Sequence, residues 1–363
     1  MARRLEADRV LFGTVIILVL FGIIMVFSAS AVIAQETYGN STYYLARQGV
    51  YAVLGLVLMV VMMNVDYRRL SNPLVIFPAL GLQVLMLFLA LLWDPFHNAH
   101  RWLHVGPLSF QPSEFSKIVV IVFLAYFLEM RKKEISDWKR TLLPIGLVVG
   151  IDALLILREP DFGSTLALTM IVAAMLFAAG LPLFYFGYGA LAAVPVIFLL
   201  VFHVGYRYKR ILAFLHPYSD PLGAGFQILQ SYIAVGTGGI TGVGLMEGKE
   251  KLFFLPEPQT DFIFAVISEE LGLIGAIAVL VLFGVILWRG LRAAARCSND
   301  FGRLLAIGLT IMVVGEALVN ISVVIGLLPT KGIPLPLVSY GGSSLVMTLL
   351  AIGILLNISQ NTS

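Results

Sequence analysis

The feature that most constrains this chain is a series of apolar stretches long enough to cross a membrane. A membrane-spanning helix needs about 20 predominantly apolar residues, and the 363-residue sequence contains ten such stretches. They are rich in Leu, Val and Ile with Gly interspersed, which favours lipid-facing helices over a closed barrel. The predicted spans are residues 9–34, 46–64, 73–93, 113–130, 141–157, 164–180, 185–204, 262–288, 302–326 and 340–357.

Composition agrees with this pattern, since 59% of the residues are hydrophobic and only 12% are charged. A soluble domain has about 25% charged residues. We therefore expect an all-α polytopic integral membrane protein, a single domain over residues 1–363, with a large outer loop (residues 205–261) between the seventh and eighth spans. The first apolar run is a full span long rather than a short signal-peptide core, so we expect it to be retained.

Basic residues give an orientation. With the N-terminus inside, 14 of the 24 Lys and Arg residues fall on the cytoplasmic side, and the other ten lie outside against the usual bias. Such an outer cluster predicts an anionic ligand, although ordinary solvated loop charges are the alternative. The sequence lacks a Walker pattern, so nucleotide-driven work is not expected, and no nucleic-acid partner is expected either.

Asp261 stands where a polar loop meets the eighth span, in the segment KLFFLPEPQTDFIFAVISEELG (Lys251–Gly272). A carboxylate at this boundary meets both lipid and water, which suits a general base or a metal ligand. The alternative is an aspartate that caps the N-terminus of a transmembrane helix. Glu269 and Glu270 follow inside the span, where a bare charge costs roughly 2.5 to 3.5 kcal/mol.

Two polar segments precede the fourth span. The loop before it holds His97, His100 and His104, which could ligate zinc in principle, but no HExxH pair is present. Arg101 and Trp102 suit an interfacial pair instead, with the ring at headgroup depth and the guanidinium toward phosphate.

Glu114 and Lys117 lie three residues apart at the start of the fourth span, so they share a helix face and can neutralise each other. The pair either lowers the cost of insertion or faces a cavity, and intramembrane pairs usually face a cavity. Asp152 and Glu316 add charges that we place in the bundle interior.

The large outer loop begins with Arg207, Lys209 and Arg210 and contains GTGGITGVG (Gly236–Gly244). These glycines could cradle phosphate through backbone amides or form a hinge. The segment Phe226–Val235 predicts a short interfacial helix.

Six segments occur in an order that points to a known family: FSAS (Phe27–Ser30), RWLHVGPLSFQPSEFSK (Arg101–Lys117), EPDFGS (Glu159–Ser164), DPLGAGFQILQS (Asp220–Ser231), FLPEPQTDFIFAVISEELG (Phe254–Gly272) and GLLPTKGIPLPLVSYGGSS (Gly326–Ser344). Over nearly its whole length the chain resembles the SEDS proteins of bacterial cell-wall synthesis, the FtsW, RodA and SpoVE group. PTKG and KLFFLPE are more similar to FtsW, the division member, than to RodA, the elongation member. Gln259 and His216 depart from the His and Asp common in the family, so neither is assigned a direct catalytic role.

The resemblance implies a peptidoglycan glycosyltransferase that polymerises lipid II on the outer face of the bacterial cytoplasmic (inner) membrane, by one inverting step. Asp261 is then the catalytic base, and the substrate-binding candidates are Arg101, Trp102, Glu114, Lys117, Arg207, Arg210 and Lys331. A divalent cation (Mg or Mn) could assist. The implied partners are lipid II, the growing glycan strand, a class B penicillin-binding transpeptidase of the FtsI kind, other divisome membrane proteins and the lipid bilayer. Both termini would be cytoplasmic.

Two other functional classes suit ten spans with buried acids. A lipid II flippase would need access from both leaflets, and inverted repeats would support it, but no repeat is evident between the halves. A non-catalytic scaffold leaves Asp261 and the outer cations without a role.

Overall fold

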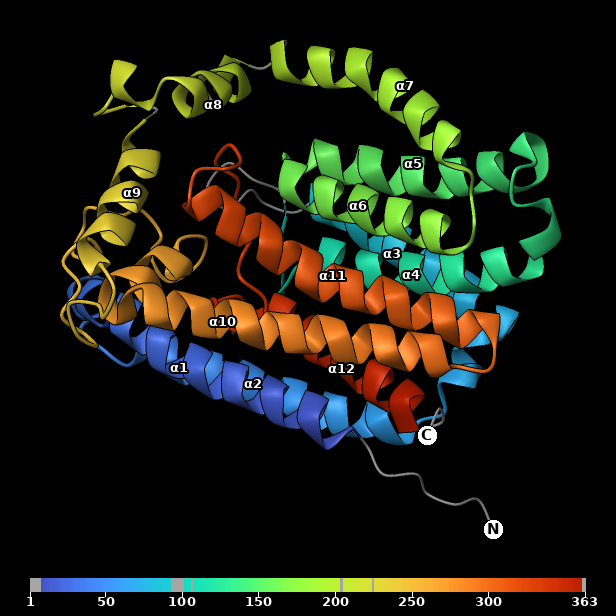
Figure 1. Cartoon of the computed structure of the whole chain (residues 1–363), viewed down its shortest axis with the longest axis horizontal. Helices are drawn as coiled ribbons and strands as arrows, with labels where there is room; N and C mark the ends of the chain where they lie inside the picture. Colours follow the sequence, from blue (N-terminus) through green and yellow to red (C-terminus); the bar gives the residue numbers. More distant parts are fainter. Residues whose placement is uncertain (1–7, 93–100, 106–107, 203–204, 224, 361–363) are drawn as a thin grey trace.

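The computed structural model describes residues 8–92, 101–105, 108–202, 205–223 and 225–360. In this part of the chain each of the ten predicted spans coincides with a helix (Figure 1): α1 (Arg9–Tyr38), α2 (Tyr43–Asn64), α3 (Pro73–Leu92), α4 (Pro112–Met130), α5 (Leu143–Arg158), α6 (Phe162–Ala178), α7 (Leu183–Phe202), α10 (Ile263–Arg296), α11 (Asp300–Val324) and α12 (Gly342–Gln360). Among the described residues, seven helices can cross a membrane by length and composition alone: α1, α2, α3, α10, α11, α12 and α5 with the turn before it. The prediction of an all-α polytopic membrane protein is confirmed.

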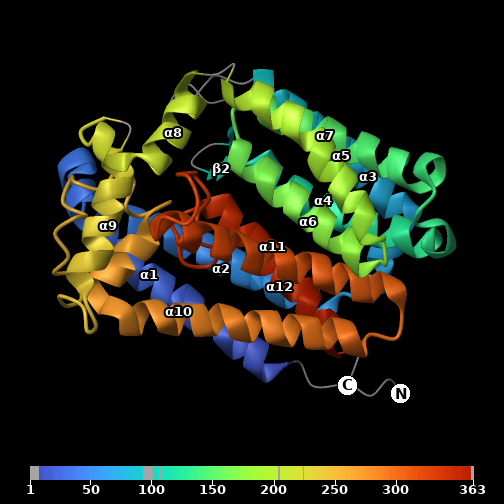
Figure 2. The ribbon, with the colours of Figure 1, turned by 45° about the horizontal axis from the view of Figure 1, so that its top comes forward.

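Buried helices occupy the middle of the bundle. α12 packs along α2 and is buried over nearly its whole length, and α11 packs against α10, α6 and α4 (Figure 2). A helix that is apolar on every side is expected to be enclosed by protein or lipid, and α12 is enclosed by protein. Peripheral helices expose one apolar face, as Leu74 of α3 and Leu154 of α5 do.

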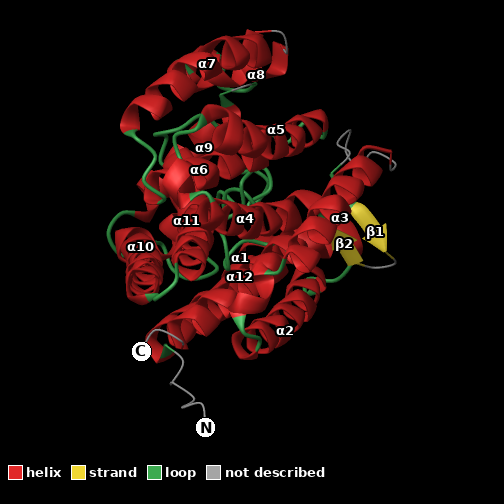
Figure 3. Cartoon of the chain, turned by 90° about the vertical axis from the view of Figure 1, so that its right-hand side faces the viewer, coloured by secondary structure: helices red, strands yellow, loops and turns green. Residues whose placement is uncertain are grey.

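Most of the irregular structure gathers at one end of the bundle. It includes a hairpin of β1 (Leu103–Val105) and β2 (Leu108–Phe110), seen in Figure 3, whose second strand packs against α12. The predicted large loop contains α8 (Gly205–Leu215), the 3₁₀ turn η4 (Pro217–Ser219) and α9 (Phe226–Gly238), which packs against α10. The helix predicted over Phe226–Val235 therefore exists and runs three residues past its predicted end, whereas its interfacial position stays a prediction.

The opposite end carries short connections and ion pairs. Its turns are η1 (Tyr67–Ser71), η2 (Lys132–Glu134) and η3 (Trp138–Leu142). Arg289 of α10 contacts Asp8 at 2.5 Å, and Lys132 contacts Asp300 at 2.6 Å. α1 begins and α12 ends here (Figure 1). The turns and helix ends that the sequence predicts to face the cytoplasm thus lie together in the described part of the chain.

A break divides α10 near its outer end. Gly272 has φ 64° and ψ −161°, and the amides of the next two residues bond to the carbonyls of Gly239 and Ile240. A Cβ on Gly242 would lie 2.1 Å from the carbonyl oxygen of Glu270, so glycine is needed for this close approach. The amides of residues 242–244 bond to other carbonyls of this junction. The amides of residues 242–244 are therefore occupied and do not form the predicted phosphate cradle.

Both acids inside the eighth span are bonded by the preceding loop, and Glu270 is also bonded by α1. Glu269 accepts from the amides of Lys249 and Glu250 at 2.7 and 3.2 Å. Glu270 forms an ion pair of 2.5 Å with Lys251 and accepts from Ser28 of α1 at 2.7 Å. These contacts tie the outer loop to α1 and α10.

Candidate functional site

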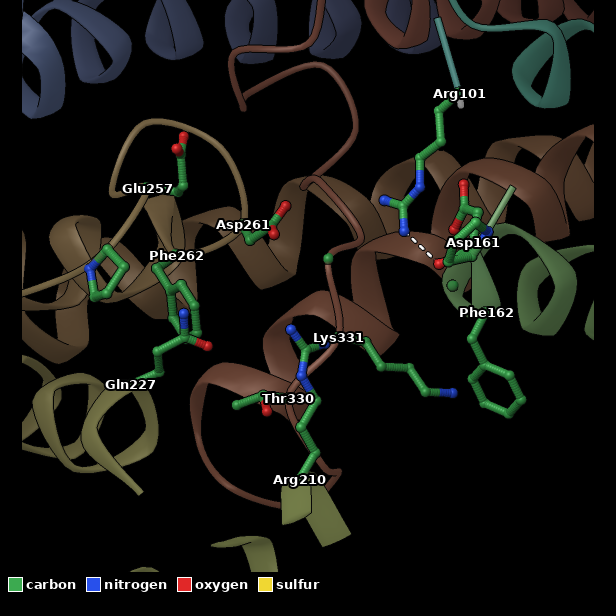
Figure 4. Close-up of a pocket in the computed structure, with 14 residues that line it drawn as sticks. Arg101, Asp161, Phe162, Arg210, Gln227, Glu257, Asp261, Phe262, Thr330 and Lys331 are labelled. Atoms are coloured by element: carbon green, nitrogen blue, oxygen red, sulfur yellow. Dashed lines mark hydrogen bonds between the residues drawn. The ribbon is translucent and has the colours of Figure 1, made fainter. Parts of the chain in front are cut away.

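Asp261 lies in the loop that leads into α10, and three neighbouring backbone contacts fix this loop. Asn320 of α11 donates to the Asp261 carbonyl at 2.8 Å, and Ser339 donates to the Thr260 carbonyl at 2.6 Å. The Tyr340 amide donates to the Gln259 carbonyl at 2.8 Å. The N-cap residue of α10 is Phe262, which makes no side-chain cap. The helix-cap alternative for Asp261 is therefore wrong, and its carboxylate points into a cavity (Figure 4).

The cavity extends from this loop into the bundle. Its outer part has a volume of about 400 Å³, and an overlapping part that reaches deeper has a volume of about 590 Å³. These volumes are in the range of sites for small molecules or sugar units. Both parts are lined by Arg101, Asp161, Gly163, Arg210, Gln227, Glu257, Asp261 and Gly332.

Three cationic side chains from separate segments reach the cavity (Figure 4). Arg101 precedes β1 and is held by the backbone carbonyls of Glu159 (3.0 Å) and Pro160. Arg210 comes from α8. Lys331 comes from the loop between α11 and α12, with its Nζ 3.9 Å from the centroid of the Phe162 ring. The cavity thus brings these three cations together with three carboxylates, those of Asp161, Glu257 and Asp261.

Burial changes the proton affinity of these groups. It raises the pKa of Asp261 to about 7, with a further increase from the nearby charge of Glu257 and opposition from Arg101 and Arg210. Burial also lowers the pKa of Lys331 to about 8, against the opposing effect of Asp161. A carboxyl group with a pKa near neutrality is suited to general-base catalysis.

The Asp261 carboxylate is backed by a glycine of the PTKG segment. A Cβ built on Gly332 would lie 2.8 Å from Oδ2 of Asp261, which is too close for any side chain. This position therefore requires glycine for the carboxylate to keep its place, although Gly332 has no unusual φ angle.

The deep wall of the cavity is formed by a buried ion-pair cluster. Lys117 contacts Glu114 at 2.9 Å and also contacts Glu316 of α11, and all three residues are at least 95% buried. The predicted pairing of Glu114 with Lys117 is confirmed, whereas its second carboxylate partner was not predicted. Asp152 is also buried, as expected, and accepts from Gln83 at 2.8 Å.

The structure brings most of the predicted site residues to one cavity: Arg101, Trp102, Glu114, Lys117, Arg210, Asp261 and Lys331. The side chain of Arg207 lies outside the described residues, as do His97, His100 and the side chain of His104. Asp161 was expected to place its charge in the bundle interior and is buried, but it was not assigned to the site, and sequence reasoning missed Tyr340 and Glu257. For Glu257, the only signal in the sequence is its position four residues before Asp261.

No metal-binding group is preformed in the described part of the chain. Those residues contain no cluster of three or more His, Cys, Asp or Glu side chains that could hold a metal ion. The divalent cation therefore stays a prediction. The positive charges that the structure shows in the cavity are those of the protein's own side chains.

Fold and site together define a multi-pass membrane protein with a carboxylate and a cation cluster in a cavity at one end of the bundle. The chain belongs to the FtsW/RodA/SpoVE family of cell cycle proteins, whose model matches residues 8–363.

Its relatives include two well-matched proteins. A probable peptidoglycan glycosyltransferase FtsW of Geobacter sulfurreducens is 43% identical over 355 residues, which cover 97% of this chain and 95% of the relative. Stage V sporulation protein E of Bacillus subtilis is 42% identical over 361 residues, which cover 99% and 98%.

Solved structures agree with the fold. A chain from a study of how a peptidoglycan synthase complex coordinates polymerization and crosslinking superposes with a TM-score of 0.81 at 31% identity. The rod shape determining protein RodA of Thermus thermophilus superposes with a TM-score of 0.73 at 28% identity. Each comparison covers 98% of both chains.

Proposed function

We propose that this chain is a peptidoglycan glycosyltransferase that polymerises lipid II on the outer face of the bacterial cytoplasmic membrane during cell division. The observation that carries the proposal is the Asp261 carboxylate, which shares one cavity with Arg101, Arg210 and Lys331. The names of the relatives, FtsW and stage V sporulation protein E, support the reaction and the link to division and sporulation.

Glycosyl transfer needs a base and a stabilised leaving group. The ionised Asp261 takes the proton from an acceptor sugar hydroxyl as the hydroxyl oxygen attacks the anomeric carbon of the donor. The new C–O bond forms while the bond from that carbon to the pyrophosphate oxygen breaks. Attack opposite the leaving group inverts the anomeric centre and gives a β-linkage, as in inverting glycosidases, where a base activates the nucleophile.

The leaving undecaprenyl pyrophosphate carries the negative charge that develops in this step. Arg101, Arg210 and Lys331 lie where they can stabilise it, and such preorganised charges are commonly the largest contribution to catalysis. Because the pKa of Lys331 is about 8, most of its side chains are protonated at neutral pH. Trp102, Glu114 and Lys117 line the same cavity and are proposed to orient the sugars. Arg207 stays a predicted substrate-binding residue, since its side chain lies outside the described residues.

Topology and partners complete the proposal. The cavity end faces outward, both termini lie in the cytoplasm, and the membrane is the bacterial inner membrane. A class B penicillin-binding transpeptidase would crosslink the strands, with other divisome proteins nearby. Support comes from the similarity to a chain solved in work on a peptidoglycan synthase complex and from the basic residues at the opposite end.

The test is polymerisation of lipid II by the purified protein, with and without such a transpeptidase. Asp261→Asn keeps the size and hydrogen bonding of the side chain but removes its basicity, so we expect glycan ladders to disappear while the protein stays folded. Asp137→Asn, a surface cap on η3, is the matched control. Ladders of normal length from Asp261→Asn refute the base assignment, and transport without polymer favours a flippase.

A further inference from the structure

Four tyrosines form a continuous group of rings between the cavity and the surface. Tyr340 lines the cavity beside Asp261, and its ring meets the edge of Tyr44 with centroids 5.0 Å apart. Tyr44 in turn meets Tyr38 and Tyr43 at 5.9 and 5.4 Å. Tyr38 and Tyr43 stack at 3.9 Å with their planes 13° apart. We call Tyr38, Tyr43, Tyr44 and Tyr340 the tyrosine shelf.

We propose that the tyrosine shelf is a binding surface for the glycan strand as it leaves or enters the cavity. The inference rests on the proposed function and names where its polymeric substrate lies. The ligand class is a β-linked amino-sugar strand that carries carboxylate-bearing peptides.

The chemistry of the shelf suits such a strand. Pyranose rings present faces of C–H groups, which pack on the electron-rich faces of aromatic rings, and tyrosine adds a hydroxyl for polar contacts. Tyr38 remains half exposed, so the stack presents a surface to a ligand. Rigid tyrosines offer large contact area at low entropic cost.

A cation stands at the same surface. The guanidinium of Arg47 lies 4.9 Å from the centroid of the Tyr43 ring, and it also interacts with the Tyr340 hydroxyl. A guanidinium forms strong, geometrically specific bonds with carboxylates. The peptide carboxylates of a nascent strand are therefore natural partners for Arg47.

The connection to Asp261 distinguishes the shelf from an ordinary belt of interfacial tyrosines. The amide of Tyr340 bonds to the carbonyl of Gln259, two residues before Asp261. Gln48 of α2 donates to the Ser339 carbonyl at 3.1 Å. The helix that carries Tyr43 and Tyr44 is thus fixed directly to the segment that positions the proposed base.

The experiment uses the full chain in detergent and the double variant Tyr38→Leu/Tyr43→Leu, which keeps apolar bulk. A fluorescein-labelled, uncrosslinked glycan oligomer is titrated by fluorescence anisotropy, and glycan ladders made from lipid II are sized on gels. We expect about tenfold weaker oligomer binding, since each aromatic contact contributes a severalfold effect, and shorter ladders. Tyr188→Leu on α7, another exposed tyrosine, is the control and should match the wild type.

The variant Arg47→Gln keeps all four tyrosine rings. It therefore tests the inference even if the double variant has a folding defect. It should weaken binding of oligomers that keep their peptides but not of oligomers with the peptides removed. Binding and ladder lengths equal to wild type in the double variant would show that the tyrosines only anchor the helix ends at the membrane, and would overturn the inference. A wild-type protein that makes no polymer refutes the proposed function instead, so the two failures are distinguishable.

Discussion

The pH dependence of polymerisation follows from the environment of Asp261. A base must be ionised to accept a proton, and with a pKa of about 7 only about 9% of Asp261 is ionised at pH 6 and about 91% at pH 8. The rate at lipid II concentrations well below KM, which reports the pKa of the free protein, should therefore rise between these values. The rise is at most about tenfold, because Lys331, with a pKa of about 8, loses part of its charge by pH 8. An ordinary aspartate with a pKa of about 3.9 would give a flat profile over this range.

The Glu257→Gln variant tests the cause of this profile. The negative charge of Glu257 raises the pKa of Asp261, so removing it lowers that pKa and moves the acid limb to lower pH. The rate at pH 6 should increase, up to a ceiling of about tenfold at full ionisation. Glu247→Gln, in the same loop and exposed, is the control. A flat wild-type profile, or an acid limb that stays in place in Glu257→Gln, would refute the assignment of Asp261 as a base tuned by its surroundings.

Three further substitutions test the surroundings of the base. Lys117→Met should lower the free energy of unfolding by about 3 to 5 kcal/mol, because two buried carboxylates lose their cation; an unchanged thermal midpoint would contradict this. Gly332→Ala should reduce the polymerisation rate roughly tenfold to a hundredfold by displacing the base, whereas Gly146→Ala, which meets no atom within 4 Å, should be neutral. Arg210→Ala should raise the KM for lipid II about tenfold or more, as expected for loss of a charged hydrogen bond, and Lys139→Ala should not; equal effects would remove the case for an outer anion site.

Much of the fold was predictable because the bilayer imposes a length on each apolar run. All ten predicted spans are helices, with ends displaced by a few residues. Asp261 and Lys117 were also recognisable, since a charge beside or inside an apolar span costs energy and usually has a function.

Features that depend on distant segments were not predictable. Glu316 joins Lys117 from a helix about 200 positions later, and Gly332 limits Asp261 only because two loops meet. The role of the glycine-rich segment was left open between two alternatives for a related reason. Glycine is required both where the backbone approaches a phosphate closely and where it approaches a broken helix closely. The sequence does not show which of the two these glycines contact.

The contacts made by Glu269 and Glu270 have a consequence for biogenesis. Both carboxylates belong to the eighth span, yet their partners come from the large loop between α7 and α10 and from Ser28 of α1. A newly inserted α10 therefore carries two unpaired acids until the loop folds back and α1 docks. The end of the bundle that bears Asp261 can therefore only be completed late in assembly. A chain with a faulty first span or a faulty large loop would lack a working base, even with every other helix in the membrane.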